Sequence, residues 1–327
     1  MIHTRDFRYK NFNLLTDLRL LQFLRSVDDG ILIGTRAGLN LAVARFARRS
    51  VIRVGQEHLN MTKYDDEIQA AFRRYYPRLD LYSALTQGDA SAFSELLGRT
   101  RVVCIANGVP HMGNVRSSND SNVVISAGRL TPQKGFDRLL AAWARVAAKH
   151  PDWELRIFGG GKLRERLEWQ IDELEVGNSA RLKGYTDRLP QEMAEAAFYV
   201  MSSRFEGFPM VLLEAMHCGL PIVSFDCPNG PRDLISPGKD GFLVPNGDID
   251  GLAAAMLDMI GIGEARRSFG EAALAKSKQY EIAPIARRWE EVLEDLVSER
   301  RRRDSRWSPT RARGRAESAP RKQRVRM

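Results

Sequence analysis

Short apolar runs alternate with longer stretches of helical periodicity through most of the chain. Before residue 107, this pattern predicts strands at 30–33, 50–54 and 102–106, and helices at 13–26, 39–49 and 65–76. After residue 122, it predicts strands at 123–127, 154–158, 180–183, 198–202, 221–225 and 241–244. Helices are predicted at 136–149, 162–175, 191–196, 209–218, 250–260, 265–277 and 285–297. Strict alternation of this kind favours an α/β fold with parallel, doubly wound sheets, which bind ligands at the carboxyl ends of their strands.

A loop rich in Gly, Asn and Ser, residues 107–122, divides the pattern into two parts. Its composition is typical of a linker between domains, and 327 residues are enough for two hydrophobic cores. We therefore predict an N-terminal domain with its linker at 1–118, a second domain at 119–298 and a tail at 299–327.

Basic residues are concentrated in that tail. Of the 50 Lys and Arg residues, 12 lie from Arg300 onward, accompanied by the acidic residues Asp304 and Glu317, so the rest of the chain is nearly neutral. Because the tail has almost no aliphatic residues, it is predicted to be disordered. It suits peripheral contact with an anionic membrane surface, and a solubilising extension without a partner fits equally well. A neutral body argues against nucleic acid as the partner.

Several classes of protein are disfavoured by composition. No apolar run approaches the roughly 18 residues that a membrane-spanning helix needs, and the N-terminus lacks the apolar stretch of a signal peptide. The three cysteines, Cys104, Cys218 and Cys227, are an odd number without metal-site spacing. These features predict a cytoplasmic protein, which the tail would hold at the inner face of the membrane.

Two cations share the loop that follows the strand at 123–127. Arg129 lies just beyond the carboxyl end of this strand, and Lys134 comes five residues later, before a helix. A planar guanidinium and a compact ammonium placed in this way can hold a diphosphate. Two solvated loop charges are the simpler alternative.

The segment SSRFEGFPMVLLEAMHCGLPIVSFD, at 202–226, predicts a second part of an anion site. Pro209 suits the first position of a helix. The N-terminus of that helix would direct amide groups and the positive end of its dipole toward a pyrophosphate, at Phe208, Pro209, Met210 and Val211.

Two glutamates flank this helix N-terminus. Glu206 lies on the preceding loop, within reach of a sugar, and Glu214 lies on the second turn among apolar residues. A carboxylate in such surroundings needs donors, and the two hydroxyls of a ribose would supply them. Taken separately, each glutamate fits an ordinary ion pair.

Together, these residues resemble the donor-site signature of the retaining GT-B glycosyltransferases of family 4. The motifs GRL, QKG, EGFPMVLLEAM and CGLPIV follow in the family's order over nearly all of residues 123–260. SFDCPNGPRDLI, at 224–235, further resembles members that build bacterial surface polysaccharides. The resemblance implies two Rossmann-like domains, of which the first is incomplete, because residues 1–29 lack the family's early strands and Gly-rich loop.

The resemblance also implies roles for the matching residues. Arg129 and Lys134 would hold the pyrophosphate and stabilise its charge as it leaves, Glu206 would contact the donor sugar and Glu214 the ribose. The base would lie at residues 184–187. RSVIRVGQEHLNM, at 49–61, is similar to the strand that ends in a histidine near the reacting sugar, which implies a catalytic role for His58.

No metal or cofactor is expected beside the nucleotide-sugar co-substrate. Asp248 and Asp250 have the spacing of an acidic metal-binding motif, but they precede a predicted helix that needs a cap, so capping by Asp248 is favoured. A cationic clamp with a helix N-terminus can stabilise the leaving diphosphate without a metal.

The sequence thus predicts a retaining hexosyltransferase. It would move a hexose or N-acetylhexosamine from a nucleoside diphosphate sugar, with uridine as the expected base, to a growing surface glycan or a lipid-linked acceptor. The main alternative is a truncated remnant that binds the nucleotide without transferring sugar. A nucleic-acid-binding protein acting through its tail and a nucleotide-sugar 2-epimerase explain fewer of these features.

Overall fold

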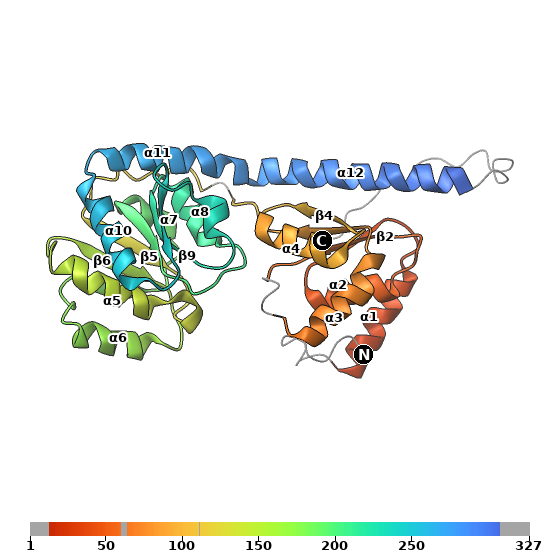
Figure 1. The fold of residues 1–327 in the computed structure, drawn as a ribbon, viewed down its shortest axis with the longest axis horizontal. Coiled ribbons are helices and arrows are strands. Elements are labelled where there is room, and N and C mark those ends of the chain that lie inside the picture. The colour runs from red at the N-terminus through yellow and green to blue at the C-terminus, as the bar shows by residue number, and fades with distance from the viewer. Residues whose placement is uncertain (1–12, 60–63, 111, 308–327) are drawn as a thin grey trace.

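The structure is a computed structural model that describes residues 13–59, 64–110 and 112–307. Within these ranges the chain forms two α/β domains that lie side by side (Figure 1). The linker after the first domain joins them, and so does the last helix, α12 (Ile282–Trp307), which runs from the second domain along the first (Figure 1). The predicted fold class, with parallel sheets in two domains, is confirmed.

The N-terminal domain is built on a parallel sheet with the strand order β1-β2-β3-β4 in its described residues. Its strands are β1 (Ile31–Gly34), β2 (Ile52–Gln56), β3 (Leu81–Ala84) and β4 (Arg101–Cys104). Its helical elements are α1 (Leu14–Ser26), α2 (Ala37–Phe46), α3 (Asp66–Tyr75), the 3₁₀ turn η3 (Tyr76–Arg78) and α4 (Gln87–Leu97). Side-chain caps fix where three helices begin, since Asn13, Asp65 and Thr86 each accept a hydrogen bond from a backbone amide three residues later.

The C-terminal domain contains a six-stranded parallel sheet with the order β10-β9-β8-β5-β6-β7. The strands are β5 (Val123–Ala127), β6 (Glu154–Phe158), β7 (Ala180–Gly184), β8 (Phe198–Met201), β9 (Ile222–Asp226) and β10 (Gly241–Pro245). The order of the strands reverses between β5 and β8, which are neighbours at the centre of the sheet. In a doubly wound sheet, this switch point is where ligands bind, beyond the carboxyl ends of the strands.

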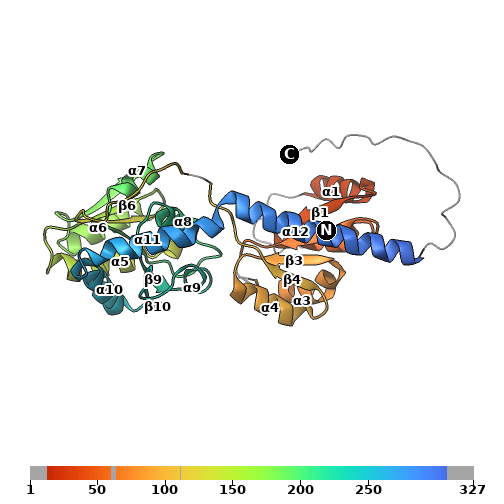
Figure 2. The ribbon, with the colours of Figure 1, turned by 90° about the horizontal axis from the view of Figure 1, so that it is seen from above.

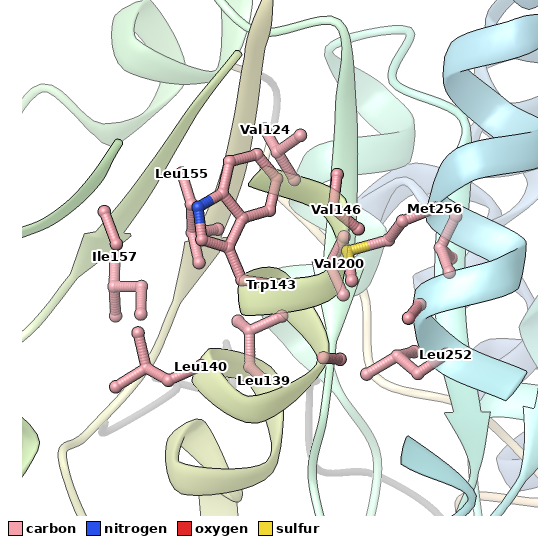
Figure 3. Close-up of a cluster of buried hydrophobic side chains, with 14 of the residues drawn as sticks. Val124, Leu139, Leu140, Trp143, Val146, Leu155, Ile157, Val200, Leu252 and Met256 are labelled. Carbon is pink, nitrogen blue, oxygen red and sulfur yellow. The ribbon is translucent and has the colours of Figure 1, made fainter. Parts of the chain in front are cut away.

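Helices cover both faces of the second sheet. They are the turn η4 (Pro132–Lys134), α5 (Phe136–Ala147), α6 (Arg164–Glu173), α7 (Leu189–Ala194), α8 (Met210–His217), α9 (Pro231–Leu234), α10 (Ile249–Gly261), α11 (Ala265–Ser277) and η5 (Lys278–Tyr280). Trp143 of α5 is fully buried at the centre of one layer, between strand residues such as Val124 and Leu155 and the α10 side chain Met256 (Figure 3). Its indole nitrogen donates to Ser179 Oγ at 3.1 Å, so the polar atom of this large side chain is satisfied.

The first domain uses α12 to complete its core. Val292 and Leu296 of α12 pack against buried residues of the first sheet, among them Val54 and Leu81. Figure 2 shows α11 lying over the second domain and α12 continuing over the strands of the first. The consecutive helices α11 and α12 therefore connect the two domains.

Most predicted elements are present with shifts of one to three residues at their ends. The prediction missed β3 and α4, which occupy the stretch between residues 77 and 101. It was also wrong about residues 299–307, because α12 continues through them to Trp307 instead of ending near residue 297. The rest of the predicted tail, 308–327, lies outside the described residues. Among the described residues, no helix is long and apolar enough to cross a membrane.

Candidate functional site

The carboxyl ends of the two sheets face a common crevice between the domains. A cavity of about 350 Å³ between the domains is lined by Gln87 of the first domain and Asp233 of the second, and Phe208 is the one predicted site residue in its described lining. The backbone amide of Gln87 donates to Asp233 Oδ1 at 3.1 Å. Asn229, on the loop after β9, donates its side-chain amide to Asp89 Oδ2 of α4 at 2.6 Å. These contacts cross from one domain to the other, so the loops that follow strands in both domains lie close together.

Glycines allow the loops around β5 to pack closely. A Cβ atom on Gly159 would lie 1.9 Å from the carbonyl oxygen of Gly128, and one on Gly161 would lie 2.5 Å from that of Leu130. Gly135 has a left-handed φ of 65°, and a Cβ atom on it would lie 2.1 Å from the carbonyl oxygen of Ser202. The loop after β5 is thereby held between the loops after β6 and β8.

Lys134 and Glu206 meet across the switch point. Lys134 Nζ lies 2.7 Å from Glu206 Oε1, and Ser203 Oγ donates to the same oxygen at 2.6 Å. The two charged side chains are only 15% and 6% exposed, so the pair is largely desolvated. Two predicted site residues that are 72 positions apart are thus joined directly, while Arg129 remains exposed at the end of β5.

The N-terminus of α8 lies beside this pair, although its details differ from the prediction. Pro209 occupies the capping position and the helix begins at Met210, one residue later than expected. Pro209 has no amide hydrogen, and the amide of Met210 already donates to the carbonyl of Phe208 at 3.0 Å. Of the four predicted amide positions, Phe208 and Val211 are left with amides that have no partner among the described residues.

Glu214 lies on α8 in a partly buried position. Desolvation raises the pKa of its carboxyl, and no described side chain or amide pairs with it. A desolvated carboxylate without a partner is costly, so it is a ready acceptor for the hydroxyl groups of a ligand. The ordinary ion pair that the sequence left open is therefore not formed among the described residues, and the binding role of Glu214 stays a prediction.

His58 follows β2 and reaches the loop that carries Glu206. A Cβ atom on Gly207 would lie 2.3 Å from the carbonyl oxygen of His58, so the two backbones are in contact across the crevice. Desolvation and, to a lesser extent, the charge of Arg36 lower the pKa of His58 and favour its neutral form. The backbone amide of His58 donates to Glu57 Oε1 at 3.0 Å, which fixes the turn after the strand.

The remaining motifs take simple positions. Asp248 caps α10 by accepting from the Gly251 amide at 2.9 Å, so the capping prediction is confirmed. The predicted base loop, 184–187, follows β7 and exposes Tyr185. All three cysteines are free thiols.

Sequence reasoning missed several residues of the crevice. Asp89, Asn229 and Gly207 connect the domains, and Ser203 holds Glu206. Asn229 has a left-handed φ of 64° beside Gly230, and the CPNGP turn was a signal for this conformation. Asp89 and Gly207 gave no local signal for these contacts, because Asn229 and His58 on the other side belong to the opposite domain.

Solved structures share this arrangement of elements. The chain matches HepE of Anabaena, solved in complex with UDP, with a TM-score of 0.77 and 22% identity over 86% of this chain and 82% of that one. It matches TarM of Staphylococcus aureus with a TM-score of 0.73 and 21% identity, over 84% and 58% of the two chains. The fold is therefore that of the GT-B glycosyltransferases.

The family follows from the sequence comparison. Residues 111–276 match the model of Glycosyl transferases group 1, and the chain belongs to this family. It is 35% identical to an exopolysaccharide phosphotransferase of Streptomyces coelicolor over 292 residues, which are 88% of this chain and 31% of that protein. It is 26% identical to the amylovoran biosynthesis glycosyltransferase AmsD of Erwinia amylovora, over 84% of this chain and 81% of the relative. The chain thus spans about a third of the first relative and most of the second.

Proposed function

We propose that the protein transfers a hexose or N-acetylhexosamine from a nucleoside diphosphate sugar to an acceptor hydroxyl, with retention of anomeric configuration. The observation that carries this proposal is the Lys134–Glu206 contact of 2.7 Å at the switch point of the second sheet. This contact supports the proposal because it brings the cation proposed to bind phosphate next to the carboxylate proposed to bind sugar hydroxyls, shortly before the start of α8.

The donor would lie along the carboxyl edge of the second sheet. Arg129 and Lys134 would bind the diphosphate oxygens, together with the amides of Phe208 and Val211. Glu214, which has no described partner, would accept hydrogen bonds from the ribose, and the loop at 184–187 would contact the base. UDP is the nucleotide we propose, and HepE and TarM, which share the fold, were both solved in complex with UDP.

Transfer requires that the bond between the anomeric carbon and the phosphate oxygen breaks. Its electron pair goes to the departing diphosphate, whose growing negative charge Arg129 and Lys134 would stabilise. The acceptor oxygen would attack on the same face and give its proton to the departing phosphate oxygen. Because these two side chains supply the positive charge, the proposed reaction needs no metal or added cofactor.

His58 and Glu206 would act on the sugar itself. The crevice places the backbone of His58 against Gly207, next to Glu206. A neutral imidazole, favoured by its lowered pKa, can accept a hydrogen bond from a sugar hydroxyl or donate one to it. We propose that both side chains orient the donor sugar while the leaving group departs.

The acceptor we propose is a growing surface glycan or a lipid-linked precursor. Relatives at 26% to 29% identity are named for amylovoran biosynthesis and for glucosyl transfer to poly(glycerol-phosphate). We further propose a cytoplasmic location with peripheral membrane contact through the Arg-rich C-terminal residues.

A transfer assay tests the proposal. The protein is incubated with labelled nucleotide sugars and acceptor extracts, and the Glu206→Gln and Arg129→Ala variants are compared with the exposed control Arg166→Gln. The two site variants should lose about 100-fold or more in turnover, because charge stabilisation in the transition state is removed. Equal turnover in all four proteins would refute the site assignment.

A nucleotide-binding remnant is the alternative function, because the first sheet has only four strands among the described residues. Calorimetry with UDP separates it from the enzyme when it is combined with the transfer assay. The remnant binds UDP and forms no product with any donor, whereas the enzyme does both.

A further inference from the structure

A second, strongly cationic cavity lies in the N-terminal domain. Its volume is about 360 Å³, and its wall contains six arginines and two carboxylates. The arginines are Arg53, Arg78, Arg99, Arg101, Arg300 and Arg303, and the carboxylates are Asp80 and Glu299.

This cavity, named here the arginine pocket, is separate from the crevice. Its residues Ile52, Asp80 and Thr100 lie at the amino ends of β2, β3 and β4, whereas the crevice lies beyond the carboxyl ends of the same strands. A strand of four or five residues spans roughly 13 to 17 Å. A ligand in the arginine pocket therefore lies too far away to touch the reacting sugar.

The walls of the pocket come from distant parts of the sequence and are fixed by ion pairs. Arg101 lies 3.3 Å from Asp295 and 3.5 Å from Glu299, both on α12. Arg53 lies 3.6 Å from Asp80. Arg300 and Arg303 are three residues apart on α12, so they lie on the same side of the helix. The last turns of α12 thus complete a ring of arginines at the end of the first sheet where β2, β3 and β4 begin.

The charges of the ring are only partly balanced by protein groups. Four more arginines than carboxylates line the cavity, and Arg78, Arg99 and Arg303 are exposed without an ion pair among the described residues. Arg53 Nε is buried, and its carboxylate neighbour, Asp80 Oδ2 at 3.6 Å, lies beyond hydrogen-bond distance. An excess of guanidinium groups around one cavity favours a bound anion with several oxygens.

We propose that the arginine pocket is a binding site for a phosphate-bearing ligand, distinct from the donor site. Guanidinium groups bind phosphate oxygens in pairs of parallel hydrogen bonds, and a ring of them selects for groups with more than one such oxygen. The volume accommodates a pyrophosphate or the phosphodiester headgroup of a lipid. A phosphate-bearing ligand in this site would be held on the first domain, while sugar transfer takes place in the crevice.

Calorimetry with inorganic pyrophosphate tests the proposal. The titration uses the full chain in an Arg129→Ala background, so that the donor site contributes little. In this background Arg99→Gln/Arg303→Gln removes two exposed pocket arginines without breaking a described ion pair. The matched control is Arg166→Gln/Arg287→Gln, which removes two exposed arginines elsewhere, one of them also on α12. A parallel arm measures sedimentation with vesicles of phosphatidylcholine containing phosphatidylglycerol.

The pocket variant should weaken pyrophosphate binding at least tenfold, while the control changes it less than twofold. A second outcome also supports the proposal: the protein does not bind pyrophosphate but sediments with vesicles, and only the pocket variant fails to sediment. The ligand of the arginine pocket is then a lipid headgroup. Both outcomes leave the donor site untouched, so they are independent of the proposed transferase activity. Equal behaviour of the pocket variant and the control in both arms would overturn the proposal.

Discussion

The two domains differ in how they are completed. The C-terminal domain has a six-stranded sheet, its own helices on both faces and a core around Trp143 that is formed within the domain. The N-terminal domain has four described strands and fills one side of its core with Val292 and Leu296 of α12. Every side chain proposed to hold the donor nucleotide belongs to the C-terminal domain, whereas His58 belongs to the N-terminal domain. Donor binding should therefore survive damage that abolishes transfer, and four predictions test this separation.

The largest effect is expected from breaking the Lys134–Glu206 pair. Lys134→Ala should lower turnover about 100- to 1000-fold, and it should destabilise the second domain by about 3 kcal/mol, because it leaves a desolvated carboxylate without its cation. Lys134→Ala/Glu206→Gln should regain most of the stability but none of the turnover. Chemical denaturation and the transfer assay measure the two quantities. Equal stability of the single and double variants would contradict a coupled pair.

The next largest effect is expected where α12 completes the hydrophobic core of the first domain. Leu296→Asp places a charge in the apolar contact between α12 and the first sheet, which should destabilise that domain by about 3 kcal/mol. Transfer should be lost while UDP affinity stays within twofold of the parent. The exposed control Ala286→Asp on the same helix should change neither. A large loss of UDP affinity in Leu296→Asp would contradict the claim that donor binding is independent of the first domain.

A smaller effect is expected where the domains touch. Gly207→Ala would bring a Cβ to 2.3 Å from the carbonyl oxygen of His58, so the crevice must open. Misplacement of catalytic groups by about 1 Å lowers turnover on the order of tenfold to 100-fold, while UDP affinity should be retained. Gly177→Ala is the control, because its nearest neighbour would be 3.9 Å away. Turnover that matches this control would show that the contact with His58 is dispensable.

The smallest effect is expected at Glu214. Glu214→Gln should weaken UDP binding about tenfold and yet raise the melting temperature at neutral pH, since a desolvated charge is removed. A raised folded pKa means that the parent is relatively stable below the unfolded pKa of about 4.3 and loses that stability as the pH rises through the folded value. The difference in melting temperature should therefore vanish at low pH. A constant difference across the pH range would show that ionisation is not its cause.

The sequence predicted the second domain well because its signals are local. Caps such as Asp248 and motifs such as GRL and EGFP fix both the helices and the loops that carry Arg129, Lys134 and Glu206. The first domain was harder to predict. Strand β3 has only four residues, and α4 contains Gly and several short polar residues, so neither has a strong period.

The arginine-rich end of α12 shows a second reason why the structure could not be fully predicted from the sequence. A run of arginines without aliphatic residues favours a prediction of disorder, but arginine also favours helices, and Glu299 and Asp295 of this helix pair with Arg101 of the first sheet. Those contacts depend on how far the helix reaches across the other domain. No local pattern encodes that distance, which also explains why the arginine pocket was not predicted.

Calorimetric titration of UDP into the parent chain and the Arg129→Ala variant is the decisive measurement for a nucleotide site at the switch point of the second sheet. We expect the parent to bind UDP and the variant to bind it at least tenfold more weakly, because a guanidinium–phosphate contact contributes about 1.5 to 3 kcal/mol. Absence of UDP binding to the parent, or equal affinity in both proteins, would contradict such a site.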